Sequence, residues 1–174
     1  MNSTSESPAS IVVAVVDDAV QIVRAKLQEK FGSQFIALVQ FGSTTRGSIK
    51  QVTDLDLFVV LDINFRSLSE KRDATRVAED AGDQVLKKLV PLGYFIAVSC
   101  IVRSKEQAQQ FSPLYLDMTL YSKIHFDVGG FAQSVISKTQ QRILETGAVR
   151  KQRGLMWYWD LAPNFKPGDK VEFF

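Results

Sequence analysis

Two short polar motifs in the first third of the chain carry side chains that could bind phosphate and a divalent cation. The first is Gly42-Ser43, which directly follows an apolar run that ends at Phe41. Glycine lets the backbone approach an anion closely, and the serine hydroxyl and the next backbone amides can donate hydrogen bonds to phosphate oxygens. Arg46, one turn beyond, would add a guanidinium to the same phosphates. This motif therefore predicts an anion-binding site.

The second motif is a pair of acids, Asp54 and Asp56, at the start of another apolar run. Residues two apart on a strand point to the same face, with Cα atoms roughly 6.6 Å apart. Two carboxylates this close repel each other, and apolar surroundings penalise their charge further, unless a cation lies between them. Mg²⁺, or Mn²⁺ in its place, fits because such ions bind carboxylates together with substrate phosphates. The pair predicts a divalent metal site.

The combination of the two motifs is more informative about function than either motif alone. Gly-Ser after a strand is commonly a tight turn, and Asp-x-Asp at a strand start is commonly a solvated edge. A strand, Gly-Ser, ten intervening residues and then Asp-Leu-Asp at the head of an apolar strand form a much rarer arrangement. In such a site, one metal ion would polarise an attacking hydroxyl and a second would stabilise a pyrophosphate leaving group.

The pattern Gly-Ser-x10-Asp-x-Asp resembles the signature of nucleotidyltransferases related to DNA polymerase beta, a superfamily that includes kanamycin nucleotidyltransferase and the minimal nucleotidyltransferases of prokaryotes. The match covers roughly residues 33–128. The resemblance implies that Gly42 and Ser43 bind the triphosphate of an NTP, with ATP the expected one, and that Asp54 and Asp56 ligate the metal. It also implies transfer of a nucleoside monophosphate to an unidentified hydroxyl acceptor, with release of pyrophosphate.

One position departs from this family. Its members usually supply a third carboxylate from the next strand, and the aligned residue here is Ser99. A serine cannot replace an ionised carboxylate as a base or as a charged ligand. Glu106, Asp117 or another chain are the sources that remain open for a third acid. Ser99 also motivates a second interpretation, a catalytically weak protein that binds a nucleotide or a partner chain, as in a toxin–antitoxin-like pair.

The elements that must position these motifs follow from the spacing of apolar residues. Three- and four-residue steps predict helices over residues 8–31, 67–89 and 131–146, and evenly apolar runs predict buried strands over 35–41, 54–61 and 94–102. Shorter elements are a turn or short helix at 43–48, a short helix at 104–110 and a short strand at 124–127, with 113–121 open between helix and extended structure. This order predicts an α/β (α+β) domain with a mixed central sheet flanked by helices, as in the polymerase beta-like nucleotidyltransferase fold.

The C-terminal part has a different character. We expect residues 1–147 to form the nucleotidyltransferase domain and 148–174 to be an aromatic and basic tail on the same domain. The tail holds Arg150, Lys151 and Arg153 and the run Trp157-Tyr158-Trp159. Its segments Trp157-Tyr-Trp-Asp-Leu and Lys166-Pro-Gly168 also resemble the ending of some stand-alone bacterial and archaeal family members. These residues could stack bases and contact phosphates, but packing of the aromatic rings on the domain is the simpler interpretation.

Composition bounds the remaining possibilities. A net charge of +2 leaves no strong overall field for nucleic acid or membrane surfaces, and no run approaches the roughly 20 apolar residues of a membrane-spanning helix. The single cysteine, Cys100, has no intrachain partner and is expected to pack in the core. We therefore expect a soluble, cytoplasmic protein, with a partner protein or a homodimer as open alternatives. The one histidine, His125, is expected to be a partly exposed strand residue without a catalytic role.

Overall fold

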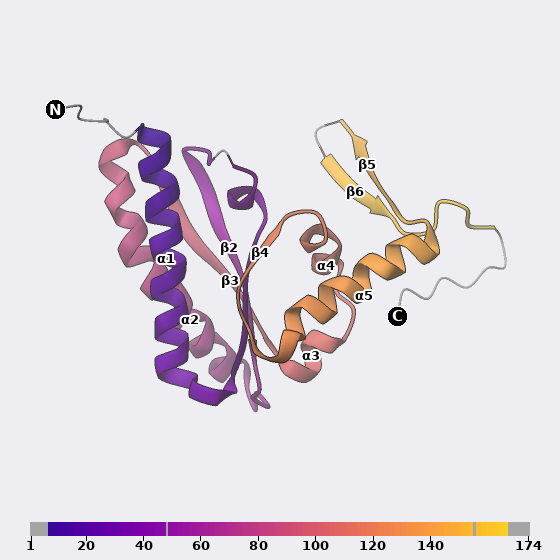
Figure 1. Cartoon of the computed structure of the whole chain (residues 1–174), viewed down its shortest axis with the longest axis horizontal. Helices are drawn as coiled ribbons and strands as arrows, with labels where there is room; N and C mark the ends of the chain where they lie inside the picture. Colours follow the sequence, from indigo (N-terminus) through magenta and orange to yellow (C-terminus); the bar gives the residue numbers. More distant parts are fainter. Residues whose placement is uncertain (1–6, 48, 155, 167–174) are drawn as a thin grey trace.

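The computed structural model describes residues 7–47, 49–154 and 156–166, and in these residues a four-stranded mixed sheet separates two groups of helices (Figure 1). The helices are α1 (Pro8–Phe31), α2 (Leu68–Leu86), α3 (Lys105–Gln109), α4 (Pro113–Met118) and α5 (Phe131–Thr146). The strands are β1 (Phe35–Phe41), β2 (Val52–Leu61), β3 (Phe95–Ser104), β4 (Ser122–Asp127), β5 (Val149–Arg153) and β6 (Met156–Asp160). The sheet order is β3-β2-β1-β4, with β2 and β3 parallel and the other neighbours antiparallel. The expected mixed sheet with flanking helices is therefore confirmed.

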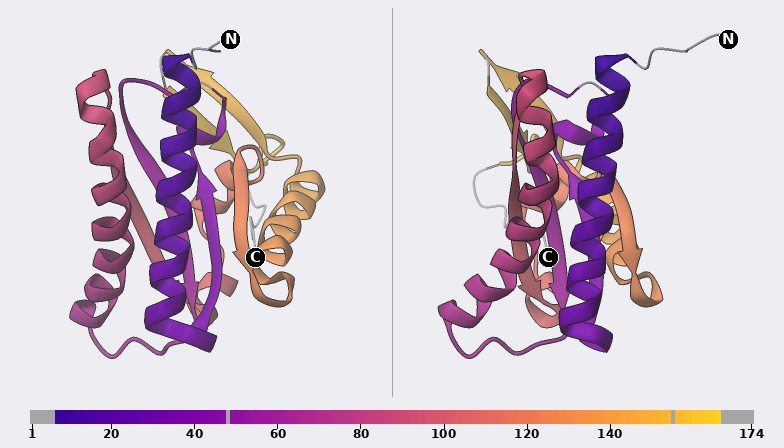
Figure 2. Two further views of the ribbon diagram at one scale, coloured as in Figure 1. Left: turned by 60° about the vertical axis from the view of Figure 1, so that its left-hand side comes forward. Right: turned by 90° about the vertical axis from the view of Figure 1, so that its left-hand side faces the viewer.

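Helices α1 and α2 lie side by side on one face of the sheet (Figure 2). The α1 side chains at three- and four-residue steps are buried there against alternate residues of β2, among them Leu55, Leu57 and Val59. The hydroxyl of Ser7 accepts a hydrogen bond from the Ser10 amide at 3.2 Å and caps the helix start. Alternation along β2 therefore fixes which of its residues point away from these two helices.

The other face of the sheet is only partly covered. Phe58 and Val60 of β2 pack under Tyr115 of α4 and Ile136 of α5. Closer to its start, β2 leaves this face open, and the side chain of Val52 is 73% exposed. We call this open part the acid face and define it by Asp54, Asp56, Ala97 and Ser99, because alternation and strand register direct these four side chains to the same side.

Most predicted elements form close to their expected bounds, with three differences. The helix predicted over 67–89 ends at Leu86 and continues as a 3-10 helix, Lys87–Leu92, that contains Pro91. The segment 113–121, for which the sequence left helix and extended structure open, begins with α4. Pro113 lies in the first turn of this helix, where its missing N–H leaves no hydrogen bond unmade. The predicted turn over 43–48 forms a 3-10 helix at Ser43–Thr45, and Ser48 lies outside the described residues.

The predicted tail contains a β-hairpin that the sequence analysis did not anticipate. Strands β5 and β6 pair antiparallel beyond the end of α5, separate from the main sheet (Figure 1). Trp159 is partly buried, and its Nε1 donates to Asp117 Oδ1 of α4 at 3.1 Å. Trp157 and Tyr158 are 54% and 46% exposed. Of these three rings, Trp159 is the one that is partly buried, next to Leu116 of α4. Residues 167–174 lie outside the described part.

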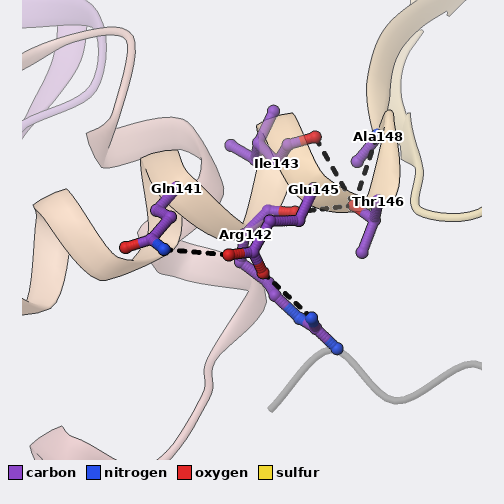
Figure 3. A network of polar contacts seen from close by, with 6 residues as sticks. All are labelled: Gln141, Arg142, Ile143, Glu145, Thr146 and Ala148. Carbon is purple, nitrogen blue, oxygen red and sulfur yellow. Dashed lines mark hydrogen bonds and ion pairs between the residues drawn. The ribbon is translucent and has the colours of Figure 1, made fainter.

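Polar contacts close α5 before the chain turns into the hairpin (Figure 3). Gly147 takes a left-handed conformation with φ of 69°, and the Ala148 amide donates to Ile143 O at 3.1 Å. The hydroxyl of Thr146 donates to Arg142 O at 2.8 Å and accepts from the Ala148 amide at 3.3 Å. These bonds end the helix at the expected glycine and fix where β5 begins.

No helix among the described residues is both long and apolar enough to cross a membrane.

Candidate functional site

Residues 42–46, which we call the Gly-Ser turn, connect β1 to the loop before β2. Gly42 has φ of 77° and ψ of −149°, a conformation that only glycine adopts readily. The Thr45 hydroxyl donates to Gly42 O at 2.8 Å and tightens the turn. A Cβ atom on Gly42 would collide with the carboxylate of Asp56, whose Cγ would lie 3.3 Å from it. The absence of a side chain at Gly42 therefore lets the turn pack directly on Asp56.

Strand register explains this approach of two residues far apart in the sequence. Phe41, the last residue of β1, pairs with Asp56 of β2, so the turn begins next to this carboxylate. Asp54 is exposed and Asp56 is half-buried on the same face of the strand. Burial, and then the charge of Asp54, raise the pKa of Asp56 above its ordinary value of 3.8. Among the described residues, neither acid forms an ion pair with a lysine or arginine.

The hydroxyl of Ser43 lies 2.8 Å from that of Thr53, and either oxygen could be the donor. When Thr53 donates, Ser43 keeps its own proton available for a phosphate oxygen. Thr53 was not singled out in the sequence, although it directly precedes Asp54. It ties the Gly-Ser turn to the start of β2, so the two motifs are linked by a side-chain hydrogen bond as well as by strand pairing.

Arg46 lies at the surface and stacks on Tyr121. Its guanidinium carbon is 4.3 Å from the centre of the Tyr121 ring, a cation–π geometry. Tyr121 directly precedes β4, and Ser122 pairs with Phe41, so this ring flanks the Gly-Ser turn. Sequence reasoning missed Tyr121 because its neighbourhood depends on β4 pairing beside β1. Contact between Arg46 and a phosphate stays a prediction.

Comparison with known proteins adds information about the fold. No protein-family model and no curated protein sequence matches the chain. Among solved structures, it is similar to the spectinomycin adenyltransferase AAD(9) from Enterococcus faecialis, solved with ATP and spectinomycin, with a TM-score of 0.51 and 10% identity over 74% of this chain and 67% of that chain. The chain has the fold of nucleotidyltransferases related to DNA polymerase beta. The fold that the sequence pattern predicted is confirmed.

Two further similar structures have lower scores. One is a toxin–antitoxin complex with AMP-PNP, with a TM-score of 0.43 and 16% identity over 72% of this chain and 90% of that chain. The other is a protein from Shewanella oneidensis, with a TM-score of 0.38 and 12% identity over 74% of this chain and 90% of that chain.

Within this nucleotidyltransferase fold, Ser99 occupies the place where a third carboxylate was expected. It pairs with Asp56 in the parallel ladder of β2 and β3, so its side chain lies on the acid face beside that carboxylate. No cluster of three or more His, Cys, Asp or Glu side chains suited to a metal exists in the described part of the chain. Within the described residues, the site therefore offers two carboxylates.

The two other candidates for a third acid lie elsewhere. Asp117 accepts the hydrogen bond from Trp159 and lies 3.8 Å from Arg150 Nε, so it belongs to the attachment of the hairpin. Glu106 is in α3, beyond the end of β3 at Ser104, and five strand residues from Ser99 to that end span about 16 Å. The suggestion that Glu106 or Asp117 completes the site is not supported by these positions.

His125 and Cys100 do not lie on the acid face, because both are on the side of the sheet that α1 and α2 cover. His125 is partly buried on β4, with its Nε2 2.9 Å from Gln40 Oε1. Cys100 is partly buried against the core beneath α1 and α2. Burial raises the pKa of its thiol to about 12, which leaves it protonated and unreactive.

Proposed function

We propose that this chain is a nucleotidyltransferase that moves a nucleoside monophosphate from an NTP, expected to be ATP, to a hydroxyl acceptor, with Mg²⁺ and release of pyrophosphate. One observation carries the proposal: the Gly-Ser turn begins directly against the carboxylate of Asp56, on the open acid face that also carries Asp54. A phosphate bound by the amides of the turn would lie beside both carboxylates.

The donor set fits a divalent cation. Asp54 and Asp56 offer hard carboxylate oxygens, and no lysine or arginine of the described residues neutralises them. The raised pKa of Asp56 reflects burial and a neighbouring negative charge, both of which a cation would offset. Asp54 and Asp56 would hold Mg²⁺ or Mn²⁺. When bound, this ion supplies positive charge for the phosphates and the leaving group.

Other residues of the chain would bind and orient the nucleotide. The amides of the 3-10 helix Ser43–Thr45 and the Ser43 hydroxyl would donate to phosphate oxygens. Arg46 would add a guanidinium after leaving or tilting from its stack on Tyr121. The acid face is open at exposed Ala97 and Val52, which gives an acceptor room to approach the two acids.

Ser99 favours a second candidate function, a catalytically weak protein that binds a nucleotide or a partner chain in the manner of an antitoxin. The register neighbour of Asp56 on β3 is a hydroxyl, which cannot take a proton from an acceptor as a carboxylate does. In that case a partner protein or a second copy of this chain would be one source of the missing acid. In either case we place the activity in the cytoplasm, in keeping with a single cysteine that has no intrachain partner for a disulfide.

The test of the proposed function is nucleotidyl transfer from α-labelled ATP with Mg²⁺ to candidate acceptors, namely small alcohols, total protein and RNA. We expect labelling by the wild type and its loss in Asp56→Asn. Equal labelling by both proteins would refute the assignment. A titration with Mg-ATP separates the alternative, because tight binding without pyrophosphate release indicates the catalytically weak protein.

A further inference from the structure

Gln40 is a buried polar residue in a strand whose other side chains are all apolar. It lies next to the last residue of β1 and is 3% exposed. An amide buried without partners is destabilising, but both ends of this amide are used. Its Nε2 donates to Thr44 Oγ1 at 3.1 Å, and its Oε1 lies 2.9 Å from His125 Nε2. The amide therefore connects β4 to the Gly-Ser turn.

The direction of these bonds defines the role of the histidine. Because Gln40 Nε2 donates to Thr44, Gln40 Oε1 must accept from His125, which requires the imidazole to carry a proton on Nε2. With its proton on Nε2, His125 keeps the Nε2 end of the amide toward the turn. Thr44 is itself buried in the middle of the turn, so a bond to its hydroxyl constrains the residues on both sides.

A cavity lies beside the turn on this side. Gln40, Thr44 and Thr45 line a cavity of about 220 Å³ between the turn, α1 and β4. Gln40 points to the face covered by α1, opposite to the acid face, because it pairs with Leu57, whose side chain packs there. On this side the turn is therefore held by hydrogen bonds beside a cavity, while on the other side Gly42 packs against Asp56.

We propose that Gln40 and His125 are positioning residues that hold the Gly-Ser turn, through Thr44, in the conformation that binds phosphate; the phosphate part of this proposal rests on the proposed function. A turn that starts with glycine samples many conformations, and fixing one of them before binding reduces the entropy lost when a ligand binds. A leucine or methionine side chain would fill the same space as Gln40 in β1. What the amide adds to this packing is its hydrogen bond to the turn.

The experiment measures order in the turn and nucleotide affinity separately. Three variants remove one member of the network with little change in shape: Gln40→Met, His125→Phe and Thr44→Val. Two conservative variants restore the lost group: His125→Gln and Thr44→Ser. Thr139→Val is a matched control, because it removes another buried hydroxyl whose bond, to Val135 O at 2.9 Å, lies within α5. Thermal melts confirm that each protein is folded at the temperature of measurement.

Hydrogen–deuterium exchange of the Thr45 and Arg46 amides reports order in the turn, since both amides donate to oxygens of Gly42 and Ser43. In the three disruptive variants we expect exchange there to accelerate about five- to tenfold, and Mg-ATP to bind more weakly by a similar factor, the effect of about one hydrogen bond. The conservative variants should return both values toward those of the wild type, and Thr139→Val should change neither.

The possible failures are distinct. Unchanged exchange and unchanged Mg-ATP affinity in Gln40→Met and Thr44→Val would overturn the positioning role. Faster exchange spread over the whole chain, with the same effect in Thr139→Val, would mean that the network contributes only to general stability. This result would also overturn the positioning role. If the wild type binds no Mg-ATP while exchange in the turn still accelerates, the network orders the turn and the proposed nucleotide function has failed.

Discussion

At the scale of single residues, the site contains a carboxylate whose surroundings disfavour its charged form. The carboxylate of Asp56 is half-buried beside Asp54 and touches the backbone of Gly42, with no cationic side chain of the described residues to balance it. Sites that bind charged ligands commonly sacrifice stability in this way. Substitutions at Asp56 and at Gly42 test how this arrangement affects the stability of the protein without ligand.

Asp56→Asn is expected to raise Tm by a few degrees in the absence of nucleotide and metal. The pKa of Asp56 is raised in the folded state, so between 3.8 and that raised value the folded chain binds more protons than the unfolded chain. The contribution of Asp56 to stability therefore falls as pH rises through this window. The Tm difference between Asp56→Asn and the wild type should grow with pH and vanish below pH 3.8.

Thermal melts over a pH series measure this difference. The same melts with Mg-ATP provide the control, since a ligand that binds the folded state raises Tm. The wild type should gain stability and the variant should gain much less. A variant that is less stable than the wild type at neutral pH without ligand would contradict this account of Asp56.

Gly42→Ala is expected to destabilise the chain by about 1–3 kcal/mol, because alanine must adopt a positive φ and its Cβ collides with Asp56. Gly47→Ala is a matched control, since Gly47 has φ of 84° and an added Cβ there meets no atom within 4 Å. Denaturant unfolding of both variants separates the collision from the backbone strain. The double variant Gly42→Ala, Asp56→Ala should lose less than the sum of the single losses, and strict additivity would exclude the proposed contact.

At the scale of helices and strands, local patterns in the sequence determine most of what could be predicted. Helix α5 follows from apolar spacing and from Gly147 at its end, and β1 follows from an evenly apolar run. The hairpin was missed because β5 is short and strongly charged, and its strand character depends on pairing with β6. The contacts of Gln40 with His125 and of Arg46 with Tyr121 were missed for a similar reason, since both depend on β4 pairing beside β1.

The attachment of the hairpin to α4 is expected to depend on Asp117. This carboxylate accepts from Trp159 Nε1 and lies near Arg150, whose Nε is buried with no hydrogen-bond partner in the described residues. Asp117→Ala should weaken the attachment by about 1 kcal/mol, the value of a typical hydrogen bond. In a Trp157→Phe background, Trp159 is the one tryptophan, and its fluorescence should shift to longer wavelength and become easier to quench.

Asp127→Ala is the control for that measurement. Asp127 accepts hydrogen bonds from the Ala132 and Gln133 amides at the other end of α5, at 2.8 and 3.0 Å, so its loss weakens a helix start without touching the hairpin. The Trp159 signal should stay unchanged in this variant. Equal spectra for Asp117→Ala and its parent would show that the hairpin is held by other contacts.

At the scale of the whole molecule, the order of strands in the sheet assembles the site. Asp56 on β2 has Phe41 of β1 as its antiparallel partner and Ser99 of β3 as its parallel partner. The Gly-Ser turn, the two acids and Ser99 therefore meet at one end of one face, although they span more than fifty residues of sequence. The motif spacing predicted the positions of the turn and of the strand that carries the acids, and Ser99 lies in the same row because β3 pairs in parallel with β2. The roles of these residues in a site stay predictions.

This row leads to a prediction about catalysis, that Ser99→Asp places a third carboxylate beside Asp56. Without metal, the added charge should lower Tm, because it increases repulsion on the acid face. With Mg²⁺ and an acceptor, a carboxylate that can take the acceptor proton should raise the rate of pyrophosphate release by about 10²-fold or more if the wild type lacks this base. Ser99→Asn is the control, since it has the size of the aspartate without its charge. A rise in both variants would point to shape and not to the proton. No rise in Ser99→Asp would mean that the third acid is supplied from elsewhere or is not needed.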